Sequence, residues 1–93
     1  MKDKELLFIT VIGNDKMGIV AHIAQVLYSC RINIEDITQK IMGGYFVMTM
    51  LVDMKDSPHT LEHVHEELEK IAQEMELKIQ VQHENIFKSM HRI

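Results

Sequence analysis

Gly13-Asn14-Asp15-Lys16-Met17-Gly18-Ile19 is a polar, glycine-bounded stretch that separates two segments of different periodicity. The segment before it, residues 6–12, is apolar at nearly every position, which is typical of a strand in the middle of a sheet. The segment after it, residues 19–30, carries apolar residues three or four apart and predicts a helix. A strand that enters a helix through such a turn leaves helical N–H groups free, so the stretch predicts a site for a carboxylate.

Two further strands are predicted downstream of this helix. Residues 32–41 alternate with a slip near Glu35-Asp36, which indicates an exposed edge strand with a β-bulge. Gly43-Gly44 then predicts a hairpin turn into residues 45–54, which are apolar on both faces and therefore suit a central strand.

The second half of the chain predicts one more helix and one more strand. Ser57-Pro58 is a helix-start signal, and Thr60 is the rival N-cap. From Leu61 to Met75 apolar residues recur every three or four positions, and residues 77–83 alternate as a half-buried strand does.

The predicted order is therefore β-α-β-β-α-β, which folds as a split β-α-β unit when both crossovers are right-handed. We expect an α+β, ferredoxin-like sandwich with a four-stranded antiparallel sheet, its first and third strands central, and two helices on one face. The second face has no helix to cover it. Residues 85–93 predict a short C-terminal helix that docks either on this face or on a second subunit.

Composition limits the class of protein. Its 93 residues predict one domain over 1–93, with its core at 6–84 and a docking segment at 85–93, and such a small domain favours a homodimer. A net charge of −4 argues against nucleic acid as a partner. No run approaches the roughly 20 apolar residues of a membrane span. The single cysteine cannot form an internal disulfide, so we expect a soluble, cytoplasmic protein without a membrane partner.

Three functions found on this fold find little support in the residues. A soft-metal carrier needs paired thiolates in the turn after the first strand, and that turn has none. Gly44-Tyr45-Phe46-Val47 matches an RNA-recognition motif only in part, because no basic residue precedes the glycine. An acylphosphatase-like enzyme needs an arginine in the first turn, where this chain has only Lys16.

The turn at 13–19 has the form Gly-x-Asp-x-x-Gly-Ile, and Ile32-Asn33-Ile34 stands between the first helix and the second strand. Both motifs resemble those of ACT domains, which are regulatory modules that bind amino acids or similar small ligands. The resemblance spans residues 6 to 84. The tail, Asn-Ile-Phe-x-x-Met-His-Arg-Ile, is similar to that of stand-alone, single-ACT-domain proteins of an uncharacterised family akin to the paired-ACT glycine cleavage repressor.

The resemblance implies a ligand site between the turn of one subunit and the start of the second strand of its neighbour. Backbone N–H groups near Met17, Gly18 and Ile19 would face a carboxylate, Asp15 would accept from an ammonium, and Gly13 would allow close approach. Equally, Asp15 could simply cap the helix and Gly18 permit tight packing. The resemblance places these residues at the ligand: Gly13, Asn14, Asp15, Met17, Gly18, Ile19 and Asn33.

Asn33 has an amide that both donates and accepts, which suits an amino acid. Its alternative role is that of an ordinary turn residue that satisfies local backbone.

His59 and His63 have the four-residue spacing of helical metal ligands, but the helical wheel places them opposite the apolar face with no third ligand evident. We therefore predict a solvated surface, no metal and no cofactor. His22 is expected at the surface, Cys30 as a buried and unreactive thiol, and Glu66 with Lys70 as a helix-surface ion pair.

These observations predict a regulatory, homodimeric ACT-domain protein that binds an amino acid and acts on a protein partner. The alternative is a constitutive protein–protein interaction module that uses the uncovered sheet face and the tail. No nucleophile–base pair or carboxylate dyad falls within reach, so we do not expect an enzyme.

Overall fold

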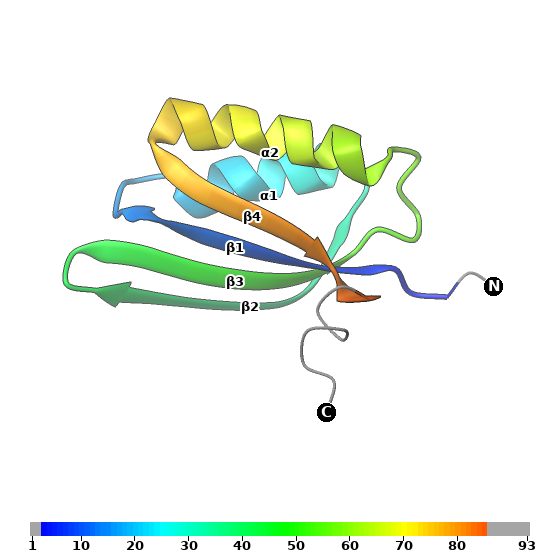
Figure 1. Ribbon diagram of the computed structural model, residues 1–93, viewed down its shortest axis with the longest axis horizontal. Coiled ribbons are helices and arrows are strands. Elements are labelled where there is room, and N and C mark those ends of the chain that lie inside the picture. Colours follow the sequence, from blue (N-terminus) through cyan, green and yellow to red (C-terminus); the bar gives the residue numbers. More distant parts are fainter. Residues whose placement is uncertain (1–2, 86–93) are drawn as a thin grey trace.

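The computed structural model describes residues 3–85 and has two layers, a sheet and a pair of helices (Figure 1). The sheet is antiparallel, with strand order β2-β3-β1-β4, so β1 and β3 are central as predicted. Its strands are β1 (Leu6–Asn14), β2 (Asn33–Met42), β3 (Tyr45–Asp53) and β4 (Leu77–His83).

Both helices, α1 (Ile19–Ser29) and α2 (Leu61–Met75), lie on the same face of the sheet (Figure 1). The core lies between them and alternate residues of the strands, because successive strand side chains point to opposite faces. Leu7, Ile9 and Val11 of β1 are fully buried, as are Met48, Met50 and Val52 of β3. The predicted ferredoxin-like fold is confirmed, and Cys30 is buried as predicted.

The ends of the two helices differ in how their backbone groups are satisfied. In α2 the hydroxyl of Thr60 accepts the N–H of His63 at 3.1 Å, so Thr60 is the N-cap and the helix does not begin at Ser57-Pro58. At the end of α1 the N–H of Ile32 donates to the carbonyl of Leu27, and the N–H of Arg31 to that of Tyr28. This pair of bonds is a Schellman motif, with Arg31 in the left-handed conformation that glycine usually fills.

Strand β2 lies at the sheet edge and carries a β-bulge between Ile34 and Asp36, as predicted. Its register opposite β3 places Ile34, Ile37 and Ile41 on the helix side of the sheet, yet all three are exposed, because α1 does not cover this edge. The sheet face without helices also exposes apolar side chains. Three of them are Ile12, Met42 and Tyr45.

The predicted C-terminal helix and docking segment lie outside the described residues, apart from Asn85. Over residues 3–85, neither helix has both the length and the apolar character that crossing a bilayer requires.

Candidate functional site

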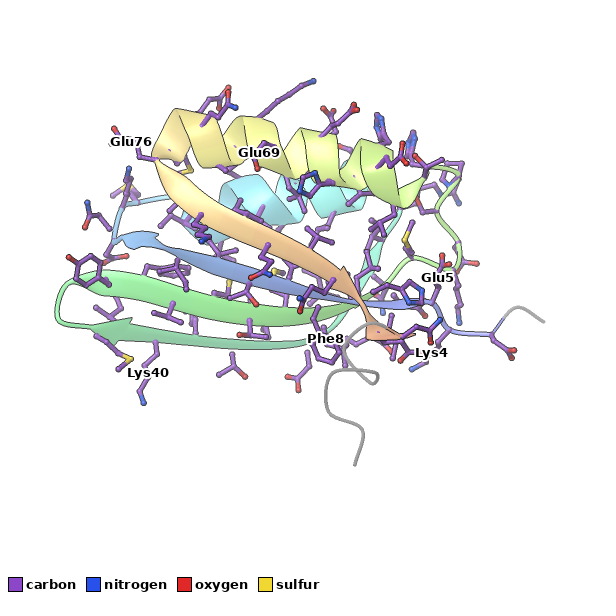
Figure 2. All side chains as sticks on the ribbon, in the orientation of Figure 1. Lys4, Glu5, Phe8, Lys40, Glu69 and Glu76 are labelled. Atoms are coloured by element: carbon purple, nitrogen blue, oxygen red, sulfur yellow. The ribbon has the colours of Figure 1, made fainter. Side chains whose placement is uncertain are left out.

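The molecule has two ends along its strands. The turn end holds the turn at 13–18, the hairpin loop at 43–44 and Glu76, which lies beyond α2 (Figure 2). At the other end, Lys4 and Glu5 lead into β1 (Figure 2). Asp53 lies at this end, which we call the Asp53 end, because it pairs with Leu6 of β1 and with Asn33 of β2. The turn and Asn33 are the two parts of the predicted ligand site. Within one chain they therefore lie at opposite ends of the sheet.

At the turn end, the turn at 13–18 is attached to the hairpin loop. The N–H of Asp15 donates to the carbonyl of Gly44 at 3.2 Å. Met17 projects from the turn and is 96% exposed, so its side chain is free to cover a bound molecule or a neighbouring subunit.

Helix α1 begins at this turn without the cap that α2 has. Its N-cap is Gly18, and among the described residues no side chain hydrogen-bonds to its first N–H groups. The first turn also contains no acidic residue. The alternative that Asp15 caps the helix is therefore wrong, and no side chain of residues 3–85 neutralises the positive end of the helix dipole by capping it.

Gly18 adopts φ 88°, a left-handed conformation in which other residues are strained. Its carbonyl accepts the backbone N–H of His22 at 3.0 Å and lies 2.7 Å from Nδ1 of the same residue. The ring of His22 therefore packs over Gly18, which adds a steric reason for glycine, since an added Cβ would lie 3.2 Å from Nδ1.

Gly13 is subject to a steric constraint that the sequence did not show. A Cβ added here would lie 2.6 Å from Cδ2 of Leu77 and 3.3 Å from the carbonyl oxygen of Glu76. The close approach that requires glycine is thus an approach of β4 to β1.

Lys16, the remaining charged residue of the turn, donates from Nζ to the carbonyl of Met75. Met75 is the last residue of α2, where a cation is favoured by the helix dipole. Lys16 therefore joins the turn to the end of the second helix.

At the other end of the sheet, the side-chain amide of Asn33 donates to Oε2 of Glu35 at 2.7 Å. Lys4 also donates to Glu35, and this bond, with the charge of Lys4 and the amide of Asn33, lowers the pKa of the Glu35 carboxyl. Asn33 thus binds a carboxylate side chain rather than local backbone, and it lines a shallow cleft with Tyr28, Ser29, Arg31 and Ile32.

Asp53 is the one buried charged residue within the described chain, at 4% exposure, and the sequence did not single it out. Its Oδ1 accepts the N–H of Glu5 at 2.9 Å and the N–H of Lys55 at 3.0 Å. Burial alone raises the pKa of Asp53, but these two N–H groups, and then the Lys55 ammonium, outweigh burial and hold it below its usual value. The Asp53 end is consequently closed by a buried ionised carboxylate.

The surface of α2 differs from the prediction in one ion pair. Nζ of Lys70 lies 2.7 Å from Oε2 of Glu67, three residues earlier, so the expected pairing with Glu66 is replaced. The hydrogen bond from Lys70 lowers the pKa of the Glu67 carboxyl.

The prediction that His59 and His63 have no third ligand beside them is also wrong. Both line a cleft against the end of α1, where Cys30 lies. The helical wheel misplaced His59 because α2 begins at Leu61, so His59 precedes the helix.

Comparison with known proteins identifies the family. A UPF0237 protein of Methanococcus maripaludis is 49% identical over 89 residues, which cover 96% of this chain and 99% of that protein. Among solved structures, an ACT domain protein from Streptococcus pneumoniae has a TM-score of 0.80 and 32% identity, covering 92% of this chain and 97% of its own.

A structure described as a glycine cleavage system transcriptional repressor has a TM-score of 0.76 and 25% identity. The match covers 86% of this chain and 46% of the repressor. The sequence profile of the ACT domain matches residues 5–82, and the chain therefore belongs to the ACT domain family.

Proposed function

We propose that this chain is a homodimeric, cytoplasmic regulatory protein that is not an enzyme. It binds an amino acid between its subunits and transmits the ligand-bound state to a protein partner. The observation that carries this is the uncapped start of α1, with Gly13, Asn14, Asp15, Met17 and Gly18 before it and Ile19 as its first residue. Free helical N–H groups and the dipole favour a carboxylate there.

The second half of the ligand site is supplied by Asn33 of a neighbouring subunit. An amino acid also carries an ammonium, which the Asn33 carbonyl oxygen and the Glu35 carboxylate suit. Because Asn33 and the turn lie at opposite ends of the sheet, one chain cannot use both on one ligand.

Pairing of two β2 edges supports such a shared site. If the two edges pair antiparallel, the start of one β2 lies beside the end of the other, next to the hairpin loop. That loop is hydrogen-bonded to the turn through Asp15 and Gly44. The exposed Ile34, Ile37 and Ile41 supply an apolar surface along the same edge.

Ala21 offers the sharpest test because it is exposed in the first turn of α1. In Ala21→Glu the new carboxylate should stabilise the apo protein by about 0.3–1 kcal/mol through the helix dipole while it repels a ligand carboxylate. The measurement is a thermal-shift screen of the twenty amino acids at fixed protomer concentration. A ligand at about 100 times its Kd adds about 2.7 kcal/mol to the wild type.

The matched control is Ala21→Gln, which keeps the size but lacks the charge and should retain the ligand shift. Asn33→Ala should also lose it. A full ligand shift in Ala21→Glu would show that the carboxylate binds elsewhere.

Ile37→Asp tests the dimer. It should convert the protein to monomers in sedimentation velocity and remove the ligand shift with them, whereas Thr49→Asp on the open sheet face should do neither. Wild-type protein that remains monomeric across the micromolar range would contradict the shared site.

The open sheet face supports a second candidate, a constitutive protein–protein interaction module. Ile12, Met42 and Tyr45 are about half exposed there, at 43%, 55% and 56%. If no amino acid shifts the melting temperature, the interaction module becomes the better-supported function. Tyr45→Lys should then abolish capture of the partner without changing the fold.

A further inference from the structure

Cys30, His59 and His63 form a cluster of metal-ligating side chains that none of the above uses. Their ligand atoms, one from each residue, all lie within 4.8 Å of one another. Cys30 directly follows α1, His59 precedes α2 and His63 lies in the first turn of α2, and the two helices pack against each other. We infer that these three side chains bind one Zn²⁺ ion, with a water molecule in the fourth position.

The donor set fits zinc. A thiolate with two imidazoles is a borderline-soft set that Zn²⁺ prefers over Ca²⁺ or Mg²⁺, which take oxygen ligands. With Zn–S bonds of about 2.3 Å and Zn–N bonds of about 2.0–2.1 Å, tetrahedral ligand atoms lie about 3.3–3.6 Å apart. Because the ligand atoms are at most 4.8 Å apart, they need to close by no more than about 1.5 Å, which rotamer adjustment supplies.

The backbone that carries each ligand is fixed. The N–H of Cys30 donates to the carbonyl of Val26, and the Schellman motif follows it directly. The N–H of His63 donates to the Thr60 hydroxyl, and that of His59 to the Ser57 hydroxyl at 3.2 Å. Ligands held on rigid backbone lose little entropy when an ion binds.

The imidazoles are also available for an ion. Their rings stack with centroids 4.3 Å apart at 21°, and over residues 3–85 no hydrogen bond occupies their ring nitrogens. The cleft that they share with Cys30 has a volume of about 170 Å³, room for an ion and its water. Glu67, one helical turn beyond His63, lines the same cleft and supplies negative charge.

The test uses the full, reduced, metal-free chain without an affinity tag. Co²⁺ serves as the spectroscopic probe, and Zn²⁺ affinity is measured by competition with a chromophoric chelator. The wild type should bind one ion per chain, with tetrahedral d–d bands and a thiolate-to-cobalt charge-transfer band. Zn²⁺ should also raise its melting temperature.

His63→Gln is the decisive variant, because His63 is half-buried on the helix surface and its replacement should not disturb the fold. Loss of a residue that only hydrogen-bonds to a metal ligand costs about 10–100-fold in metal affinity, so loss of a ligand itself should weaken Zn²⁺ binding by more than about 100-fold. His65→Gln, two residues further on and exposed, is the matched control and should bind as the wild type does.

Cys30→Ser should remove the charge-transfer band, and circular dichroism shows whether this buried position still folds. Equal affinity in His63→Gln and His65→Gln would overturn the site. So would an octahedral Co²⁺ spectrum without a charge-transfer band, or no binding at micromolar Zn²⁺.

Discussion

The two ends of the sheet satisfy their polar groups in opposite ways. At the Asp53 end a buried carboxylate, a side-chain N-cap and a Schellman motif bind backbone groups within the chain. At the turn end, α1 starts on Gly18 without a side-chain cap, next to the exposed Met17. The start of α1 therefore differs from the start of α2 in lacking a side-chain acceptor for its first N–H groups.

Of the variants that test this comparison, Asp53→Ala should lower the free energy of unfolding most. It leaves the N–H groups of Glu5 and Lys55 without their acceptor. Hydrogen bonds to a charged group contribute about 1.5–3 kcal/mol each, so the free energy of unfolding should fall by about 3 kcal/mol or more. Urea denaturation at pH 7 measures it.

Asp53→Asn is the control, since it keeps an oxygen at Oδ1 and should cost less. It also tests the pH dependence. Because folding lowers the pKa of Asp53, its stabilisation is present above the ordinary value of 3.8 and is lost as the pH falls through the lower folded value. The wild type should lose more stability than Asp53→Asn between pH 6 and about pH 2. If the wild type and Asp53→Asn lost the same stability over this pH range, Asp53 would not be ionised in the folded protein.

Gly13→Ala probes the turn end. The new methyl group meets Leu77 at 2.6 Å, and overpacking of this kind costs about 1–3 kcal/mol. Combination with Leu77→Ala should recover part of that loss, so the double mutant should be more stable than the sum of the two changes predicts. Strict additivity in thermal unfolding would show that the clash is relieved elsewhere.

Thr60→Ala removes the side-chain cap of α2 and should lower stability by about 1 kcal/mol, which is roughly 4–8 °C in Tm for a domain of this size. Thr60→Ser keeps the hydroxyl and should stay close to the wild type. Equal losses in both variants would mean that the methyl group of Thr60 is what matters.

Arg31→Gly should have the smallest effect and the opposite sign. Arg31 is held at φ 60°, and glycine relieves that strain of about 1 kcal/mol, partly offset by its greater freedom in the unfolded chain. A gain of about 0.5 kcal/mol is expected by chemical denaturation. Arg31→Ala keeps the strain and should show no gain, so an equal gain in both variants would exclude this explanation.

The fold could be predicted because its signals are local. Alternation in residues 77–83 and the three- and four-residue spacing from Leu61 to Met75 depend only on neighbours along the chain. The helix start was ambiguous because Ser57-Pro58 and Thr60 both fit a cap, and the choice depends on how the preceding loop leaves β3.

The candidate site, too, could be predicted only where its residues lie close together in the sequence. The turn at 13–19 is visible as a motif, but the constraint on Gly13 comes from Leu77 on another strand. The ionised Asp53 depends on N–H groups of two other segments, and the Cys30 cluster depends on the packing of α1 against α2. No periodicity within one segment encodes such contacts.

The bulge in β2 has a consequence for self-assembly. An uninterrupted edge strand offers a continuous row of backbone groups that can template fibres. Between Ile34 and Asp36 the ladder shifts by one residue, and a bulge of this kind bends and twists the strand locally. A second chain that pairs with this edge in regular register is therefore confined to the part of β2 after the bulge, which favours a closed pair over a growing stack.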